Sequence, residues 1–425
     1  MSLREYAFEE LSGADEEKIE GEAGNWLRHA ASLGLTKSAD GLFDPKLVLS
    51  WLLTALSVPS VFVGLLVPIR EAGALLPQLL TAPRIHAMPR RKWAWAGAAA
   101  VQGLMVGAIL LAALTLEGAA AGWAICIALA VLALGRSVAS VSYKDVLGKT
   151  VSQSRRGAAT GTAATVAAGV VIVFAGLLIW APVARMNLVI GALCVAAAAF
   201  LLAAVIFVGL SEKATPDEVE TSPLGALAQL KSLWRDPVLG RFVIVRGLLV
   251  STSLAPPYLV MMAANAGNEA FQRLGALVLA AAVASLLSSY VWGRLADRSS
   301  RWVLVLAGGS GAAALVLALG LEALGLVGTI WALPLALFAL MIAYHGVRQG
   351  RSTYLVDMSP EDKRLEYAAA ANTAIGITLL GTGVFGALAS AAGPGWTIGL
   401  FAAMAGLAAV IGLGLPEAEA AGSGE

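Results

Sequence analysis

The stretch LGALVLAAAVASLLSSYVWGRLADRSSR, residues 274–301, decides the fold predicted for this chain of 425 residues. Its first nineteen residues carry no charge, and the nine that follow contain Arg294, Asp297, Arg298 and Arg301. An α-helix rises 1.5 Å per residue, so ~20 apolar residues cross the ~30 Å hydrocarbon core of a bilayer. The stretch therefore predicts a membrane-spanning helix that ends in a charged loop.

The same unit of an apolar run and a short polar connection recurs along the chain. Hydrophobic residues make up 58% of the sequence and charged residues 13%, with a mean hydropathy of +0.79, which is more apolar surface than a soluble core can bury. The runs lack the two-residue alternation of a barrel wall, so helices must satisfy the backbone in lipid. We predict an all-α membrane protein with twelve spans, at residues 47–67, 69–87, 93–115, 120–142, 158–180, 188–210, 241–264, 274–292, 302–321, 327–347, 366–390 and 396–414.

Lysine and arginine fall almost entirely on every second connection. These connections hold Arg84, Arg90, Arg91 and Lys92; Lys144, Lys149, Arg155 and Arg156; Lys213, Lys231 and Arg235; Arg294, Arg298 and Arg301; and Lys363 and Arg364. Basic connections stay on the cytoplasmic side during insertion. We therefore expect a multi-pass protein of the cytoplasmic (inner) membrane with both termini in the cytoplasm.

The longest connection, residues 211–240, follows the sixth span and divides the chain into two halves of six helices, 46–210 and 241–415. Behind Ser222 and Pro223 it has leucines at three- and four-residue spacing. This pattern predicts an amphipathic helix on the cytoplasmic membrane surface that tethers the two halves.

The two ends of the chain are polar. Residues 1–45 are acidic and are expected to form a cytoplasmic extension, helical around Trp26 to Leu33, which is either solvated or docks a partner. Residues 416–425 are expected to form a cytoplasmic tail.

The connection between spans eight and nine matches a known loop signature. Residues 293–301, GRLADRSSR, fit the pattern Gly-x-Leu-x-Asp-Arg. With twelve spans and a 6+6 division, residues 46–415 thus resemble the major facilitator superfamily of secondary transporters. The counterpart between spans two and three, residues 83–92, keeps the basic end but has no Asp. The resemblance implies two halves that rock about a midplane site in a monomer.

The resemblance also implies a latch between the halves on the cytoplasmic side. Asp297 is expected to sit near the N-terminal end of span five, unless the loop charges are simply solvated. The expected gating residues are Gly293, Asp297, Arg298, Arg301, Arg156 and Gly157.

Ionisable groups at membrane depth are costly and are therefore functional candidates. Arg136 lies eight residues before Lys144, ~12 Å above the cytoplasmic boundary, and either binds substrate or anchors neighbouring helices. Arg70 and Glu71 open the second predicted span, ~21 Å from Arg84 and toward the outer leaflet. There Glu71 either couples protons or forms a charge pair at the outer interface.

Four further polar residues are candidates in the second half. His345, near the end of span ten, titrates near neutral pH and can relay a proton. Arg348, on the next turn, makes a cytoplasmic vestibule positive and favours an anionic or zwitterionic solute. Alternatively, it is one of the basic residues that ordinarily occur at the cytoplasmic ends of spans. Tyr258 in span seven and Asn372 in span eleven suit a cavity wall.

The sequence thus predicts a proton-coupled secondary active transporter of a small organic solute that works by alternating access. Two alternatives stay open: a related membrane factor that handles lipid or pigment without transport, and a drug or metabolite exporter. No clustered catalytic groups, phosphate-cradling loop or metal-ligand spacing occurs, so we expect no enzyme activity, cofactor or metal. Because the charges are segregated to loops, no nucleic-acid partner is expected; the partners are solute, protons and the lipid bilayer.

Overall fold

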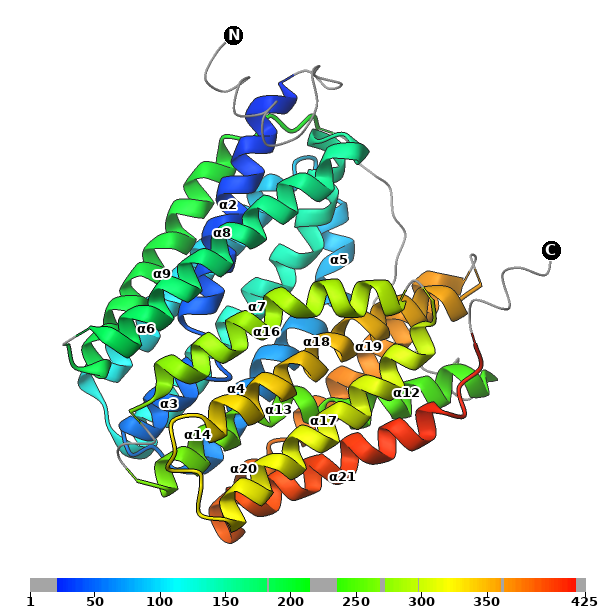
Figure 1. Ribbon diagram of the computed structural model, residues 1–425. Helices are drawn as coiled ribbons and strands as arrows, with labels where there is room; N and C mark the ends of the chain where they lie inside the picture. Colours follow the sequence, from blue (N-terminus) through cyan, green and yellow to red (C-terminus); the bar gives the residue numbers. More distant parts are fainter. Residues whose placement is uncertain are drawn as a thin grey trace.

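Helices make up most of the part of the chain that the structure describes (Figure 1). The structure is a computed structural model, and it describes residues 21–181, 183–214, 235–267, 272–296, 298–360 and 363–417. Nine segments of these ranges are long and apolar enough to cross a membrane. The predicted amphipathic helix behind Ser222, the chain before residue 21, and Asp297 lie outside the described residues.

Two sets of helices build the two halves. The first half contains α2 (Glu22–Leu42), α3 (Val48–Ala55), α4 (Ser60–Leu75), α5 (Gln78–His86), α6 (Lys92–Thr115), α7 (Gly118–Thr150), α8 (Gln153–Trp180) and α9 (Arg185–Val208). The second half contains α12 (Pro237–Leu249), α13 (Ser251–Leu254), α14 (Pro256–Asn265), α16 (Leu274–Ala296), α17 (Ser300–Ala323), α18 (Ala332–Met358), α19 (Arg364–Gly381), α20 (Val384–Ala392) and α21 (Pro394–Gly412).

The expected cytoplasmic extension of residues 1–45 is wrong for the residues from Glu22 onward. These form α2, which packs against α8 and α9 and belongs to the first half. Trp26 is fully buried and its indole Nε1 donates a hydrogen bond to the carbonyl of Arg155 at 3.2 Å. Glu22, also fully buried, pairs with Arg155 at 3.1 Å. Span one is therefore α2 followed by α3.

The first two predicted spans, 47–67 and 69–87, are shifted for the same reason. The turn between spans one and two lies at Ser57, which has a positive φ of 54°, and Pro59 precedes α4. Pro68, which falls between these two predicted spans, lies inside α4. Span two is α4 followed by α5, and the other ten predicted spans overlap the remaining helices in order.

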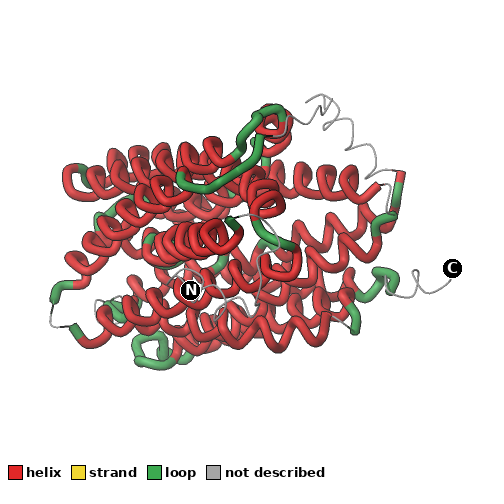
Figure 2. Tube along the Cα trace, turned by 90° about the horizontal axis from the view of Figure 1, so that it is seen from above, coloured by secondary structure: helices red, strands yellow, loops and turns green. Residues whose placement is uncertain are grey.

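The two halves meet on one side of the bundle and diverge on the other. We call the side on which α2 and α12 begin and α21 ends the terminal side, and the other the opposite side. Extensive packing between the halves joins α8 to α16, α4 to α19 and α20, and α3 to α14. In Figure 1 the terminal ends of α5 and α12 lie apart, whereas α3, α14 and α20 lie close together. Figure 2 shows the same bundle from a perpendicular direction, with the loops at the helix ends.

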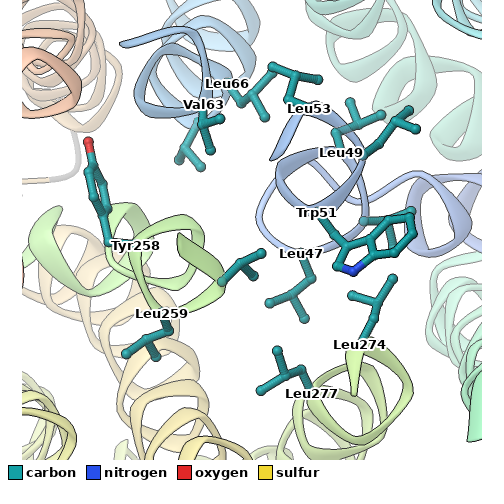
Figure 3. Packing of buried hydrophobic residues seen from close by; sticks show 14 of the residues in the cluster. Leu47, Leu49, Trp51, Leu53, Val63, Leu66, Tyr258, Leu259, Leu274 and Leu277 are labelled. Carbon is teal, nitrogen blue, oxygen red and sulfur yellow. The ribbon is translucent and has the colours of Figure 1, made fainter. Parts of the chain in front are cut away.

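An apolar cluster closes the opposite side between the halves (Figure 3). Leu47 and Val63 of the first half lie in one buried cluster with Tyr258 and Leu277 of the second. Burying such side chains stabilises the contact by ~25 cal/mol per Å² of apolar surface. This seal holds the opposite side shut.

Two glycines allow the closest approach of the halves. A methyl group placed on Gly64 of α4 would lie 2.4 Å from the Cα of Gly386 in α20 and 2.8 Å from the Tyr258 hydroxyl. A side chain at either position would force α4 and α20 apart.

The basic residues of these connections that the structure describes lie on the terminal side. The loop that lacks the signature Asp is held by Glu212, whose carboxylate accepts hydrogen bonds from the backbone N–H groups of Arg91 and Lys92 at 3.0 and 2.8 Å. The Arg91 side chain pairs with Asp145 at 3.0 Å. These contacts stay within the first half.

Candidate functional site

The break between α2 and α3 places two charges in the middle of span one. α2 ends at Leu42, and Asp44, Pro45 and Lys46 follow before α3 begins. Pro45 has no backbone N–H to continue a helix, and the Asp44 side chain accepts a hydrogen bond from the backbone N–H of Lys46 at 3.0 Å. Discontinuous helices at midplane build solute and ion sites in many transporters.

Asp40, one turn before this break, joins three helices. One carboxylate oxygen accepts a hydrogen bond from Arg70 of α4 at 2.8 Å, and the other accepts one from Arg136 of α7. Asp40 is 19% exposed and Arg136 is 37% exposed, so solvent reaches the pairs and screens them. The contacts order the three helices while leaving the charges accessible to a solute.

Lys46 links the two halves directly. Its ammonium lies 3.6 Å from the ring centroid of Tyr344 in α18. Glu71 of α4 lies within electrostatic range of Lys46 and of Arg348 and Arg351 from the second half. The predicted position of Glu71 at the outer interface is therefore wrong, because α4 begins at Ser60 and carries Glu71 to the middle of the bundle.

The second half contributes a matching set of polar groups. Arg246 of α12 is 5% exposed and donates a hydrogen bond to the amide oxygen of Asn372 in α19 at 2.8 Å. His345 lies beside Tyr344, with 5.2 Å between ring centroids. Within the described residues, the buried Nε2 of His345 has no hydrogen-bond partner.

These groups form one cluster, which we call the central charge cluster. It comprises Lys37, Asp40, Asp44, Lys46, Arg70, Glu71, Arg136, Arg246, Tyr344, His345, Arg348, Arg351 and Asn372. Seven of its members are Lys or Arg and three are Asp or Glu, which leaves an excess of four positive charges. Positive charge confined between low-dielectric walls attracts anions.

The structure brings together six of the seven substrate and coupling candidates. Tyr258 is the exception, because it is 2% exposed, packs against Phe401 with 5.4 Å between centroids, and belongs to the apolar seal of the opposite side. Its Pro256-Pro257 neighbours begin α14 and direct the ring toward that seal.

The described gating residues make no latch between the halves in this conformation. Arg301 pairs with Glu417 at 2.6 Å, inside the second half. Arg156 donates hydrogen bonds to the carbonyls of Val151 and Gly148 at 2.9 and 2.7 Å, inside the first half. Gly157 and Arg298 are exposed. At Gly293, nothing lies within 4 Å of the place that a Cβ would occupy. Asp297 lies outside the described ranges. The two halves diverge on the terminal side in this conformation, which explains why these residues make contacts only within their own half.

Sequence reasoning missed Lys37, Asp40, Asp44 and Lys46. Their charges lower the hydropathy of residues 22–55, so an apolar-length criterion assigned most of them to a solvated extension. Two signals point to a span nevertheless: buried-type residues recur from Trp26 onward at helical spacing, and Asp44-Pro45 is typical of a helix break. A span lined with charges is typical of a solute pathway.

Other chemistry is not supported by the part of the chain that the structure describes. It contains no group of three or more His, Cys, Asp or Glu side chains that could hold a metal ion. Cys126 is buried, Cys194 is exposed, and both are free thiols.

Comparison with known proteins relates this chain to transporters by its fold. No protein-family model matches the sequence, and no curated protein matches it. Among solved structures, the nucleoside transporter NupG is 12% identical with a TM-score of 0.66 over 92% of this chain and 98% of its own. A D-xylose–proton symporter is 13% identical with a TM-score of 0.69 over 93% and 98%. The POT family transporter PepTSo is 11% identical with a TM-score of 0.68 over 94% and 99%.

The matches cover nearly the whole of this chain and nearly the whole of each solved chain. The chain shares the fold of these transporters, as its resemblance to the major facilitator superfamily implied.

Proposed function

We propose that this protein is a proton-coupled secondary active transporter that carries a small organic anion, or a zwitterion with a carboxylate, across the cytoplasmic membrane by alternating access. The observation that supports it best is the excess of four positive charges in the central charge cluster. Charge buried at membrane depth is costly unless it is paired. An anionic solute supplies the missing counter-charge.

The arrangement of the halves supports an inward-open state. The opposite side is closed by the apolar seal, and the terminal side carries the basic connections. Because basic connections remain in the cytoplasm, the terminal side is the cytoplasmic side in this proposal. Solute then enters the cluster from the cytoplasm in this state and from outside in the alternative state.

Like charges on the two halves provide a way to couple solute binding to closure. Lys37 of the first half lies within electrostatic range of Arg348 of the second. Two like charges repel each other, and the repulsion is stronger in a site of reduced dielectric constant than in bulk water. An anion between Lys37 and Arg348 turns this repulsion into two attractions, so the loaded protein closes its terminal side more readily than the empty one.

Proton coupling follows from competition for Arg70 and Arg136. Both guanidinium groups are held by the Asp40 carboxylate when no solute is bound. A solute carboxylate or phosphate that takes these donors releases Asp40, which then binds a proton. The proton on Asp40 and the solute are therefore bound together, and a proton gradient drives accumulation of the solute.

Uptake into proteoliposomes tests the proposal. Pooled radiolabelled organic anions, neutral sugars and nucleosides are presented with and without an imposed pH gradient. We expect anions alone to accumulate, and only with the gradient. Arg351→Gln should reduce anion flux at least tenfold, whereas Arg185→Gln, at the start of α9 on the opposite side, should retain it. Asp40→Asn should abolish gradient-driven accumulation and retain exchange of labelled for unlabelled anion.

Three results would contradict the proposal. Accumulation of neutral solutes alone would refute the anionic substrate class. Accumulation that is independent of the pH gradient would refute proton coupling. If folded protein moves no solute in either direction, the non-transporting membrane factor is the better reading.

A further inference from the structure

A groove on the surface of the first half shares no residue with the central charge cluster. It has a volume of about 230 Å³ and is lined by Gly24, Leu27, Arg28 and Ala31 of α2 and by Ile206 of α9. The walls are apolar apart from Arg28. It lies near the terminal ends of both helices, because α2 begins at Glu22 and α9 ends at Val208.

The groove continues into a lipid-facing surface of α9. Leu202 and Val205, on the turn before Ile206, are 51% and 70% exposed. In a chain with a membrane transporter fold, large exposed apolar side chains of this kind face acyl chains. The groove and this face together offer one continuous apolar track.

The mouth of the groove is positively charged. Arg28 reaches Gly209, where its Nε lies 3.2 Å from the place that a Cβ would occupy. On either side of Gly209, the carbonyls of Val208 and Leu210 accept hydrogen bonds from the ammonium of Lys92 at 2.9 and 2.6 Å. Arg28 and the exposed Arg90 both lie within electrostatic range of Lys92. The nearby Glu212 is occupied by backbone N–H groups.

Arg28 has donors to spare. Among the described residues, no hydrogen bond or ion pair involves its guanidinium group. Trp93, which is 51% exposed, lies next to this site with its ring 5.4 Å from the Lys92 ammonium. Exposed tryptophan is typical of the membrane–water interface, where lipid headgroups lie.

We propose that this groove binds one anionic phospholipid of the leaflet on the terminal side, with the lipid phosphate between Arg28 and Lys92 and one acyl chain along Leu27, Ala31 and Ile206. The headgroup charge is complementary to the mouth, and the apolar track is open to the bilayer along its length. The bound lipid bridges the start of α2 to the end of α9 and to the start of α6. This site is independent of the proposed transport activity.

Native mass spectrometry of the full-length protein tests the site. The protein is titrated with phosphatidylglycerol and, in parallel, with phosphatidylcholine of the same acyl chains. We expect one phosphatidylglycerol to be retained at a concentration at least about tenfold lower than phosphatidylcholine. Arg28→Gln should remove this preference, and Arg185→Gln, at the other end of α9, should keep it. Ala31→Trp, which fills the groove at an exposed position, should reduce retention of both lipids.

Additional measurements distinguish a bound lipid from other occupants of the groove. Equal retention of the two lipids, or a preference that survives both Arg28→Gln and Ala31→Trp, overturns the proposal. If glycerol phosphate or inorganic phosphate displaces the lipid at equal concentration, the site recognises a soluble phosphate instead. If selective retention appears only after removal of residues 2–20, the acidic segment of this chain is the occupant, and the proposal is wrong.

Discussion

Replacing Gly64 with alanine should shift this protein toward the state that is open on the opposite side. The added methyl would lie 2.4 Å from the Cα of Gly386, whereas two carbon atoms are in contact at ~3.5–4.0 Å. α4 and α20 must therefore separate by roughly 1 Å. Overpacking of this kind costs roughly 1–3 kcal/mol, and this cost destabilises the closed packing of the apolar seal between the halves.

The cost changes the balance between two states. In the alternative state of the proposed cycle, the opposite side opens and α4 separates from α20, so the methyl is accommodated. A difference of 1–3 kcal/mol corresponds to a shift of about 5- to 150-fold in the equilibrium constant. Gly107→Ala in α6 is the matched control, because nothing lies within 4 Å of the added methyl there.

Double electron–electron resonance in nanodiscs measures the shift. One spin-label pair, at Ser154 and Ser352, spans the terminal ends of α8 and α18; the other, at Glu117 and Leu324, spans the halves on the opposite side. Both native cysteines are first replaced by alanine. We expect Gly64→Ala to shorten the first distance and lengthen the second. Unchanged distributions for both pairs in a folded protein would refute the view that this glycine crossing holds the inward-open state.

Three further predictions concern other contacts. Gly275→Ala should shift both distances in the same direction as Gly64→Ala, because its methyl would lie 2.8 Å from the Cβ of Leu178 at the crossing of α16 and α8; an opposite shift would contradict the assignment of the closed side. Glu22→Gln removes the charge partner of the 3%-exposed Arg155 and should lower the free energy of unfolding in detergent by about 3 kcal/mol. The double variant with Arg155→Met should recover part of this loss, and an equal loss in the double variant would speak against a buried ion pair. Asp236→Ala removes the cap that accepts hydrogen bonds from Val238 and Leu239 and from the Tyr367 hydroxyl, and should cost about 1 kcal/mol at pH 7. Although burial raises the pKa of Asp236, these hydrogen bonds hold that pKa below its usual value. The stabilisation is therefore present above the unfolded-state pKa and is lost as the pH falls through the folded-state pKa. Denaturation at pH 7 and pH 3 should show that the difference in stability between the variant and the unmodified protein shrinks in acid.

The topology could be predicted from the sequence because the bilayer fixes the length of an apolar span. Ten predicted spans overlap helices of the structure in order, and the described basic residues of the connections gather on one side as expected. The same criterion failed for span one, where Lys37 and Asp40 replace apolar residues. A helix that lines a polar site contains charged residues, and these interrupt the long apolar run by which spans are recognised.

The candidate site was predicted only in part. Arg136, Arg70, Glu71 and His345 were identified because single charges at depth are conspicuous, but their partners could not be named. The partner of Arg136 is Asp40, at a separation of 96 residues, and no local pattern reports such a contact. Tyr258 was assigned to a cavity wall because it is a polar residue within a predicted span, yet tertiary packing places it against Phe401.

The ion pairs of Asp40 also constrain how this protein is made. A lysine, arginine or aspartate at the centre of an inserting helix costs ~2.5–3.5 kcal/mol each on the scale of the cellular insertion machinery. Span one carries Lys37 and Asp40, and it is absent from the nine segments that are apolar enough to insert on length and composition. Its counter-charges, Arg70 and Arg136, are synthesised later. We therefore expect α2 to settle into the bilayer only after α7 has left the ribosome, so that insertion begins with the third and fourth spans and span one follows.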